Sequence, residues 1–432
     1  MSKKILFIVC LLFIIAGARA DFSLAYTSSV PVMPAGYSEK PLGHFLIRYY
    51  PADRLLLEYL LPQWLKIADF LEEKFAFKPA EIIPIEIYPD KSDFSIAATL
   101  PEEIVEKSGT VGICKFGKLM IVSPRVLPWG YRWLDTLAHE YTHYLINSLS
   151  AGKCPLWLHE GIAHYCDTWW RKEPELSAAE KNILSKTTPD KLIPFERMSP
   201  SLVFLPTPED ISLAFAEVKS VLLYLNDFSR VKDLLTKIAA GEKTEPAWES
   251  VLAEPWDKFV FNWQKYLQEK FTDSESRGVI SEIKNYTIKD EIAQFVGPDA
   301  RGRVYLGEKL YQMKELAAAE RQFSLALNDE PDNPIIVTKL VRCYLAEGKF
   351  IPVATELLEK SVAKNPDYYV SYILLGEIYL GNNELEKAKK SLTEATMINP
   401  FYRPLHYLLS QVYSRLGLFD LARRELAIYN SY

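Results

Sequence analysis

The feature that most constrains this chain is a repeat of about 34 residues that occupies its last third. Small residues and prolines recur at matched offsets in two of the copies: Gly307, Ala319 and Pro331 in one, Gly376, Ala388 and Pro400 in the other. A period of this length is typical of helix–turn–helix units that stack on one another. The small residues let paired helices approach closely, and the prolines end the second helix of each pair.

About four copies of the repeat fit between residues 300 and 432. In its period and in its residue types, this region resembles the tetratricopeptide repeats. The resemblance implies an all-α solenoid whose repeats each contribute one helical hairpin. It also implies that the region binds a protein partner.

The first 20 residues have the layout of a secretory signal peptide: two lysines, an apolar run over residues 5–15, and a small-x-small pattern at residues 18–20. We therefore expect an extracytoplasmic protein, periplasmic or secreted, after removal of residues 1–20. The run is short for a membrane span, although an uncleaved N-terminal anchor is the alternative interpretation, and no later run is long enough to cross a bilayer. A net charge of −6 without a dense basic block argues against nucleic acid as a partner.

Residues 21–275 are predicted to form an α+β domain in which a small sheet precedes a helical part. The expected strands are residues 44–50, 81–89, 110–116 and 118–124, with a helix over residues 52–75 between the first two. Pro84 favours a sheet edge for the second of these strands. A polar stretch at residues 272–278 marks a boundary. We therefore expect a linker or connecting helix over residues 276–299 and a separable repeat module over residues 300–432.

Residues 137–147, LAHEYTHYLIN, raise the question of a metal site. His139 and His143 are four residues apart, so on a helix both imidazoles project from one face. Two imidazoles at this spacing can share a tetrahedral zinc ion, and Glu140 beside them can reach a water molecule that the metal activates. The apolar stripe of this helix lies on another face, so the helix can pack and still present both rings. A pair of buried structural histidines is the alternative interpretation.

A catalytic zinc ion needs a third protein ligand, and the next predicted helix supplies a candidate. Glu160 lies in PLWLHEGIAHY, residues 155–165, after a turn that can bring this helix back beside the first. His159 points about 100° away from Glu160, so we expect a cleft or surface residue there. Taken together, HEYTH and WLHEG resemble the gluzincin zinc peptidases of the MA clan, and among these the bacterial peptidase MA-like group. The resemblance extends in outline over residues 43–271.

This resemblance implies a thermolysin-like zincin domain, one Zn²⁺ ion, and hydrolysis of a peptide or protein substrate. Matched residue by residue, it gives His139, His143 and Glu160 as metal ligands and Glu140 as the general base. The residues considered by themselves point to the same four positions. By family likeness, the strand KLMIVSP at residues 118–124 is expected to offer an exposed edge to the substrate backbone.

Two positions depart from the family pattern. His164 stands where relatives place a carboxylate that supports a ligand histidine. It could be a substitute partner, a nitrogen near the metal, or a residue of the helix face. Phe215 stands where relatives often have a tyrosine that donates to the oxyanion. Tyr165 and Tyr224 are the candidates to replace that donor, and the sequence does not separate them.

Two functions are consistent with these patterns. The first is an exported zinc metallopeptidase whose repeat module recruits a partner or substrate. The second is a non-catalytic envelope scaffold, in which a degenerate metal-binding domain is joined to a protein-interaction solenoid. The complete set of three ligands and a base favours the enzyme, while the departures at His164 and Phe215 favour the scaffold.

Overall fold

The structure, a computed structural model, describes residues 36–199, 202, 205–271 and 290–431. The predicted signal peptide lies outside these residues, as does more than half of the predicted linker at 276–299. Among the helices that the structure describes, none is both long enough and apolar enough to cross a bilayer.

A five-stranded mixed sheet forms the first part of the fold, with the strand order β1-β2-β3-β5-β4. The inner strand β3 pairs in parallel with β2 and β5, and β1 and β4 pair antiparallel at the two edges. Buried residues occupy both faces of β3 and β5, as expected for inner strands. The strands are β1 (Ser38–Leu42), β2 (Phe45–Tyr49), β3 (Ile83–Tyr88), β4 (Gly112–Lys115) and β5 (Lys118–Val122).

Two expectations about this sheet are wrong. The strand that contains Pro84 is β3, which is an inner strand and not an edge. Pro84 is its second residue, and the start of a strand tolerates a missing N–H group. The KLMIVSP strand is β5, which is paired on both sides, so the edge strand beside it is β4. The order of strands depends on tertiary pairing, which the pattern along a single strand does not encode.

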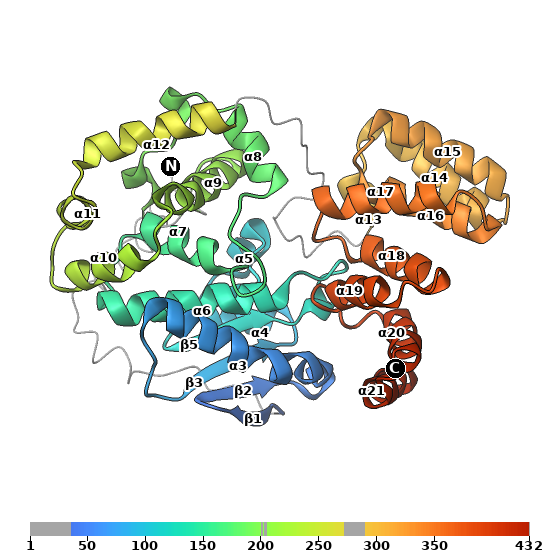
Figure 1. Cartoon of the computed structure of the whole chain (residues 1–432), viewed down its shortest axis with the longest axis horizontal. Coiled ribbons are helices and arrows are strands. Elements are labelled where there is room, and N and C mark those ends of the chain that lie inside the picture. Colours follow the sequence, from blue (N-terminus) through green and yellow to red (C-terminus); the bar gives the residue numbers. More distant parts are fainter. Residues whose placement is uncertain (1–35, 200–201, 203–204, 272–289, 432) are drawn as a thin grey trace, which may run out of the picture.

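Helix α6 (Trp133–Ser150) is the central element of the N-terminal part. It contacts strands β4 and β5 of the sheet, helix α3 (Leu55–Phe75) beside it, and helix α7 (Leu156–Cys166) above it (Figure 1). Helix α9 (Pro208–Leu225) covers α7 in turn. The remaining helices of this part are α4 (Lys91–Ala98), α5 (Glu102–Ser108), α8 (Ala178–Ser185), α10 (Ser229–Ala239), α11 (Thr244–Leu252) and α12 (Trp256–Lys270).

The C-terminal part is a row of four helical hairpins, preceded by the short helix α13 (Glu291–Phe295). A methyl group at Gly307 or Gly376 would lie 2.5 Å from Phe323 or Leu392 in the second helix of the same hairpin. The prediction that small residues permit close helix approach is therefore confirmed. The hairpins are α14 (Pro298–Gln312) with α15 (Leu316–Asp329), α16 (Pro334–Glu347) with α17 (Ile351–Lys364), α18 (Tyr369–Gly381) with α19 (Leu385–Thr396), and α20 (Arg403–Arg415) with α21 (Phe419–Ser431).

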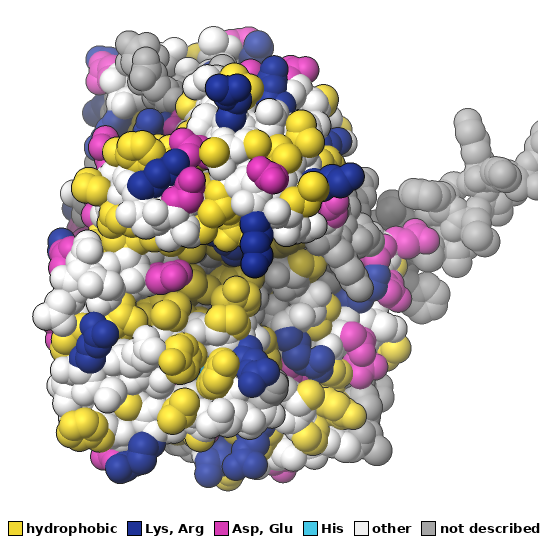
Figure 2. Space-filling model, turned by 90° about the vertical axis from the view of Figure 1, so that its right-hand side faces the viewer, with side chains coloured by type: hydrophobic (Ala, Val, Ile, Leu, Met, Phe, Trp, Pro, Cys, Tyr) yellow, Lys and Arg dark blue, Asp and Glu magenta, His cyan; other side chains and the backbone are white. Residues whose placement is uncertain are grey.

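The C-terminal part contacts the N-terminal part at several points. Arg132, just before α6, donates to Asp367 and to Glu394 of α19. Helices α16 and α18 are buried over almost their whole length within the core of the repeats. The Trp129 ring meets Phe295 edge-on at 5.5 Å, and Ile428 of α21 belongs to the N-terminal hydrophobic core. The predicted repeat module therefore forms an interface with the N-terminal part, and its separability stays a prediction. On the face seen in Figure 2, hydrophobic side chains lie among charged ones around a hollow.

Candidate metal centre

The candidate centre is built on α6, where Asp135, His139 and His143 share one face because each is four residues from the next. The rings of His139 and His143 are 4.6 Å apart and nearly perpendicular. Their side chains are 20% and 11% exposed, so both rings are accessible to a small ligand. The opposite side of α6 is fixed in the core by residues such as Leu137 and Tyr141.

Glu160 comes from α7, which a short turn brings back beside α6. Ala151 ends α6 in the left-handed conformation, with φ at 51°, and so reverses the chain. Gly161 then allows α7 to approach α9, because a Cβ atom there would lie 2.8 Å from the carbonyl oxygen of Val218. Close packing on both sides therefore holds Glu160 over α6.

Three donor atoms converge at this point. The Nε2 atoms of His139 and His143 are 3.0 Å apart, and the Oε2 atom of Glu160 lies 3.7 Å and 3.6 Å from them. Ligand atoms about 2.0–2.1 Å from a tetrahedral zinc ion lie roughly 3.3 Å from one another. The observed distances bracket this value, so the three residues could hold zinc and leave one coordination position open.

His159 orients His143. From the sequence, His159 was expected only to be a cleft or surface residue. Nε2 of His159 lies 3.2 Å from Oδ1 of Asn147, which can only accept, so this nitrogen carries the proton. Nδ1 of His159 then accepts from Nδ1–H of His143 at 2.7 Å. The Nε2 lone pair of His143 is thereby directed toward the other ligand atoms, as a metal ligand requires.

Two of the three candidate ligands, Glu160 and His143, also have the charges that a metal ion needs. Burial raises the pKa of Glu160, but His143 and His139 outweigh it and lower that pKa to about 2. Burial lowers the pKa of His143 well below its ordinary value. Burial also lowers the pKa of His139, yet its hydrogen bond with Glu160 and nearby carboxylates raise it overall. At neutral pH Glu160 is therefore ionised and His143 is neutral, the states in which both bind metal.

Glu140 lies buried beneath the edge strand β4. Its carboxylate accepts a backbone hydrogen bond from Cys114, and Gly112 leaves room for it, because a Cβ atom there would lie 2.8 Å from Oε1 of Glu140. Burial raises the pKa of Glu140 to about 7, with His139 lowering it and Glu160 raising it. A carboxyl group with this pKa exchanges protons near neutral pH, as a general base does.

His164 is a member of an ion cluster with Asp167 and Glu180. Its Nδ1 and Nε2 atoms lie 2.8 Å from Asp167 and 2.8 Å from Glu180. Burial and Lys219 lower the pKa of His164, but Asp167 and Glu180 raise it by a larger amount. The pKa is therefore about 10, above the ordinary 6.5. Both nitrogens therefore carry protons at neutral pH and donate to carboxylates.

Asp167 supplies a carboxylate beside a ligand histidine, which His164 cannot do. Asp167, His139 and His164 have ligand-type atoms within 4.8 Å of one another. The buried Oδ1 atom of Asp167 accepts no hydrogen bond within the part of the chain that the structure describes. Asp167 was not predicted for this role, because the family pattern has its carboxylate at position 164, three residues earlier.

Tyr165 and Tyr224 lie in aromatic clusters. Tyr165 stacks on Phe228 at 5.6 Å, and burial raises its pKa to about 12. Tyr224 packs against Phe259 and Tyr266 at 5.4 Å and 5.2 Å. Within the described ranges, neither tyrosine forms a ring contact or a hydrogen bond with any of the three ligand residues. The role of either tyrosine as an oxyanion donor stays a prediction.

Phe215 also lies near the ion cluster, since its ring meets that of His164 edge-on at 6.0 Å. It cannot donate a hydrogen bond. His159, Asn147 and Asp167 are thus the polar residues that the structure adds to the predicted set.

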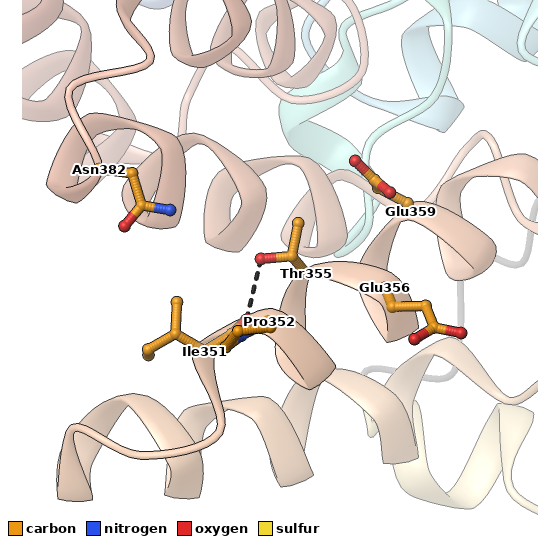
Figure 3. Close-up of a pocket in the computed structure, with 6 residues that line it drawn as sticks. All are labelled: Ile351, Pro352, Thr355, Glu356, Glu359 and Asn382. Atoms are coloured by element: carbon orange, nitrogen blue, oxygen red, sulfur yellow. Dashed lines mark hydrogen bonds between the residues drawn. The ribbon is translucent and has the colours of Figure 1, made fainter.

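A separate pocket lies in the repeats, between the start of α17 and the end of α18 (Figure 3). Its volume is about 460 Å³. Thr355 turns its hydroxyl inward along α17 and donates to the carbonyl of Ile351 at 2.9 Å, while Glu359 accepts from Tyr379 at 2.5 Å. The lining residues are Ile351, Pro352, Thr355, Glu356, Glu359 and Asn382.

Comparison with known proteins identifies the repeats. A family model described as the tetratricopeptide repeat matches residues 353–412. DnaJ homolog subfamily C member 3 of Mus musculus is 30% identical over 105 residues, which are 24% of this chain and 21% of that protein. The matched segment thus spans about a fifth of this relative.

Solved structures also resemble part of this chain. The crystal structure of MamA is 26% identical over 29% of this chain and 72% of that one, with a TM-score of 0.27. A thermophilic tetratricopeptide-repeat protein of Thermus thermophilus is 31% identical over 31% of this chain and 73% of that one, with a TM-score of 0.29. The family match and the hairpin geometry together show that the C-terminal hairpins form a tetratricopeptide-repeat solenoid, a protein-interaction module.

Proposed function

We propose that this protein is an exported zinc metallopeptidase of the gluzincin type, with a thermolysin-like zincin domain over residues 21–275. The observation that carries the proposal is the convergence of His139, His143 and Glu160 at 3.0–3.7 Å, with Glu140 buried beside them. The predicted signal peptide at residues 1–20 supports a periplasmic or secreted location.

In this proposal each residue has a defined task. Zinc, when bound, acts as a Lewis acid that lowers the pKa of water toward about 7 and polarises the scissile carbonyl group. His139, His143 and Glu160 hold the ion, and His159 keeps His143 in the required tautomer. Glu140 accepts a proton from the attacking water and passes it to the leaving amine. The edge strand β4 offers its unpaired backbone groups to an extended peptide.

Glu140→Gln is the decisive test of the enzyme. Glutamine has nearly the same shape but cannot accept the proton, so we expect hydrolysis to fall by about 10²–10⁴-fold while zinc content stays near one per chain. The measurement is cleavage of a fluorogenic peptide pool by the full chain, together with metal analysis of the same samples.

A matched control replaces Glu175, a largely exposed glutamate in a surface ion pair, by glutamine. This variant should keep both zinc and hydrolysis. If Glu140→Gln and wild type cleave the same peptides at the same rate, the assignment of Glu140 as the base is rejected.

The second candidate function is a non-catalytic envelope scaffold with a degenerate metal-binding domain. Two observations favour it: the matching family model lies in the repeats, and His164 is held in an ion cluster where the peptidase pattern has a carboxylate. This candidate predicts that the wild-type chain binds zinc but cleaves none of the peptides. In both candidates the solenoid binds a protein partner.

A further inference from the structure

The residue immediately before α6, Arg132, is enclosed by the repeats. Its Nε atom donates to Asp367 at 2.8 Å, Nη1 donates to Glu394 at 2.9 Å, and Nη2 donates to the carbonyl of Pro366 at 2.6 Å. The side chain is only 11% exposed. Arg132 therefore fixes the start of α6 to the turn before α18 and to helix α19, with all three guanidinium nitrogens in use.

The backbone around Arg132 is held by the same part of the solenoid. The amide of Tyr131 donates to the carbonyl of Ile398 at 3.0 Å. Gly130 has a φ of 67°, and a Cβ atom on it would lie 2.2 Å from that carbonyl oxygen. The indole of Trp133 donates to the carbonyl of Thr396 at 3.5 Å. The first turn of α6 thus rests directly on the end of α19, with no side chain between them at Gly130.

Asp135 connects this junction to both helices that carry the candidate ligands. It lies on α6, one turn before His139 and on the same face. Its carboxylate accepts from Arg171 at 2.9 Å and from the Trp170 indole at 3.1 Å, two residues that follow α7. The starting end of α6, the segment after α7 and the repeats therefore meet at one cluster of charged residues.

We propose that the repeats position the two ligand-bearing helices through Arg132, so that the zinc affinity of the centre depends on the solenoid. The inference rests on the proposed function, because it takes His139, His143 and Glu160 as zinc ligands. Arg132 is a positioning residue: it is seven residues from His139, about 10 Å along the helix axis. A helix moves as a rigid rod, so a shift at its start moves both imidazoles relative to Glu160. Metal sites tolerate only a few tenths of an ångström in their ligand distances.

The test measures zinc affinity in the full chain by competition with a chromogenic chelator. We expect Arg132→Gln to weaken zinc binding by about 10-fold or more, the loss typical of residues that orient metal ligands. Glu394→Gln removes the partner from the repeat side, far from the centre in sequence, and should weaken binding in the same direction. Arg132→Lys keeps the charge but cannot make the three contacts, so its affinity should fall between that of wild type and that of Arg132→Gln.

The matched control is Lys387→Gln, which removes the cation of an exposed ion pair on the same helix α19. It should leave zinc affinity unchanged. If wild type binds zinc and the Arg132 and Glu394 variants bind it equally well, the inference is overturned, even when their melting temperatures fall. If Arg132→Gln does not fold, Glu394→Gln and Arg132→Lys decide the question. If the wild-type chain itself binds no zinc, the proposed function fails instead.

Discussion

Two of the clusters that combine histidine with glutamate among the described residues are built in opposite ways. Where α3 meets the last hairpin, His406 places one ring nitrogen 2.8 Å from Glu425 and the other 2.6 Å from the carbonyl of Pro400, and Tyr59 donates to Glu425 at 3.0 Å. The His406 ring and the Tyr59 hydroxyl thus each face an acceptor. At the candidate metal centre, by contrast, two imidazole nitrogens and one carboxylate oxygen face one another.

The difference shows how to tell a structural polar cluster from a binding site. A buried cluster whose donors and acceptors are matched holds two parts of a fold together and needs nothing else. A cluster in which imidazole nitrogens and a carboxylate oxygen converge within metal-ligand distances of one another can in addition hold a cation. The same two residue types therefore join two domains in one place and can hold a metal ion in the other.

The largest effect should come from removing a ligand. His143→Ala or Glu160→Ala leaves only two of three donor atoms, so we expect zinc affinity to fall by about 1,000-fold or more, roughly 4 kcal/mol. Zinc analysis after dialysis against a weak chelator measures this. Unchanged zinc content in both variants would remove the basis for calling the cluster a metal centre.

The matched cluster should respond to mutation with lost stability and not with lost metal. Glu425→Ala leaves His406 and Tyr59 without their buried acceptor, so we expect the free energy of unfolding to fall by about 3 kcal/mol. Thermal and denaturant unfolding of the full chain measure this. Glu386→Ala, at an exposed glutamate of α19, is the control and should change little. Equal stability of the two variants would mean that the cluster does not hold the parts together.

An intermediate effect is expected at His159, which contacts the candidate ligand His143 but is not itself a candidate ligand. His159→Ala removes the acceptor that fixes the tautomer of His143, and we expect zinc affinity to fall by about 10-fold. Chelator competition measures the change. Tyr165→Phe, on the same helix, is the control and should bind zinc as wild type does. If the two variants behave alike, His159 has no part in orienting His143.

The last prediction concerns pH dependence at Glu217, a fully buried carboxyl group outside the candidate metal centre. Burial raises its pKa to about 8 from an ordinary 4.5, while the amide of Ile193 donates to it. Between these two values the folded chain binds one proton more than the unfolded chain, so this group makes stability fall as pH rises. Glu217→Gln removes that dependence. We expect the variant to melt about 2–4 °C higher at pH 8 and at the same temperature near pH 4.5; a gain independent of pH would contradict the argument.

The sequence predicted the parts of the centre that local geometry determines. Helical periodicity places His139 and His143 on one face, and the short turn before α7 limits where Glu160 can go. The roles of His159 and Asp167 depend instead on how closely α7 packs on α6 and α9, which Gly161 and its neighbours decide. The distances between packed helices cannot be predicted from the residue pattern of any one of them.

In the fold, too, the local features could be predicted and the long-range contacts could not. The period of the repeats predicted their hairpins, because Gly307 and Gly376 each lie against a residue of the same hairpin. The strand at β4 was predicted, but its position at the sheet edge and the junction at Arg132 were not, because both depend on tertiary contacts. The partners of Arg132 in the repeats, Asp367 and Glu394, follow it by 235 and 262 residues.

The contact between Tyr59 and Glu425 has a consequence for the order in which the protein is made. The two residues are 366 positions apart, and a ribosome adds about 5–20 residues each second. Glu425, the acceptor of Tyr59, is therefore synthesised on the order of 20–70 s after Tyr59. Until α21 emerges, the Tyr59 face of α3 and the core position that Ile428 fills stay open to water and to other proteins. Helix α21, the last helix that the structure describes, packs on α3, so this surface is concealed only once α21 has been added.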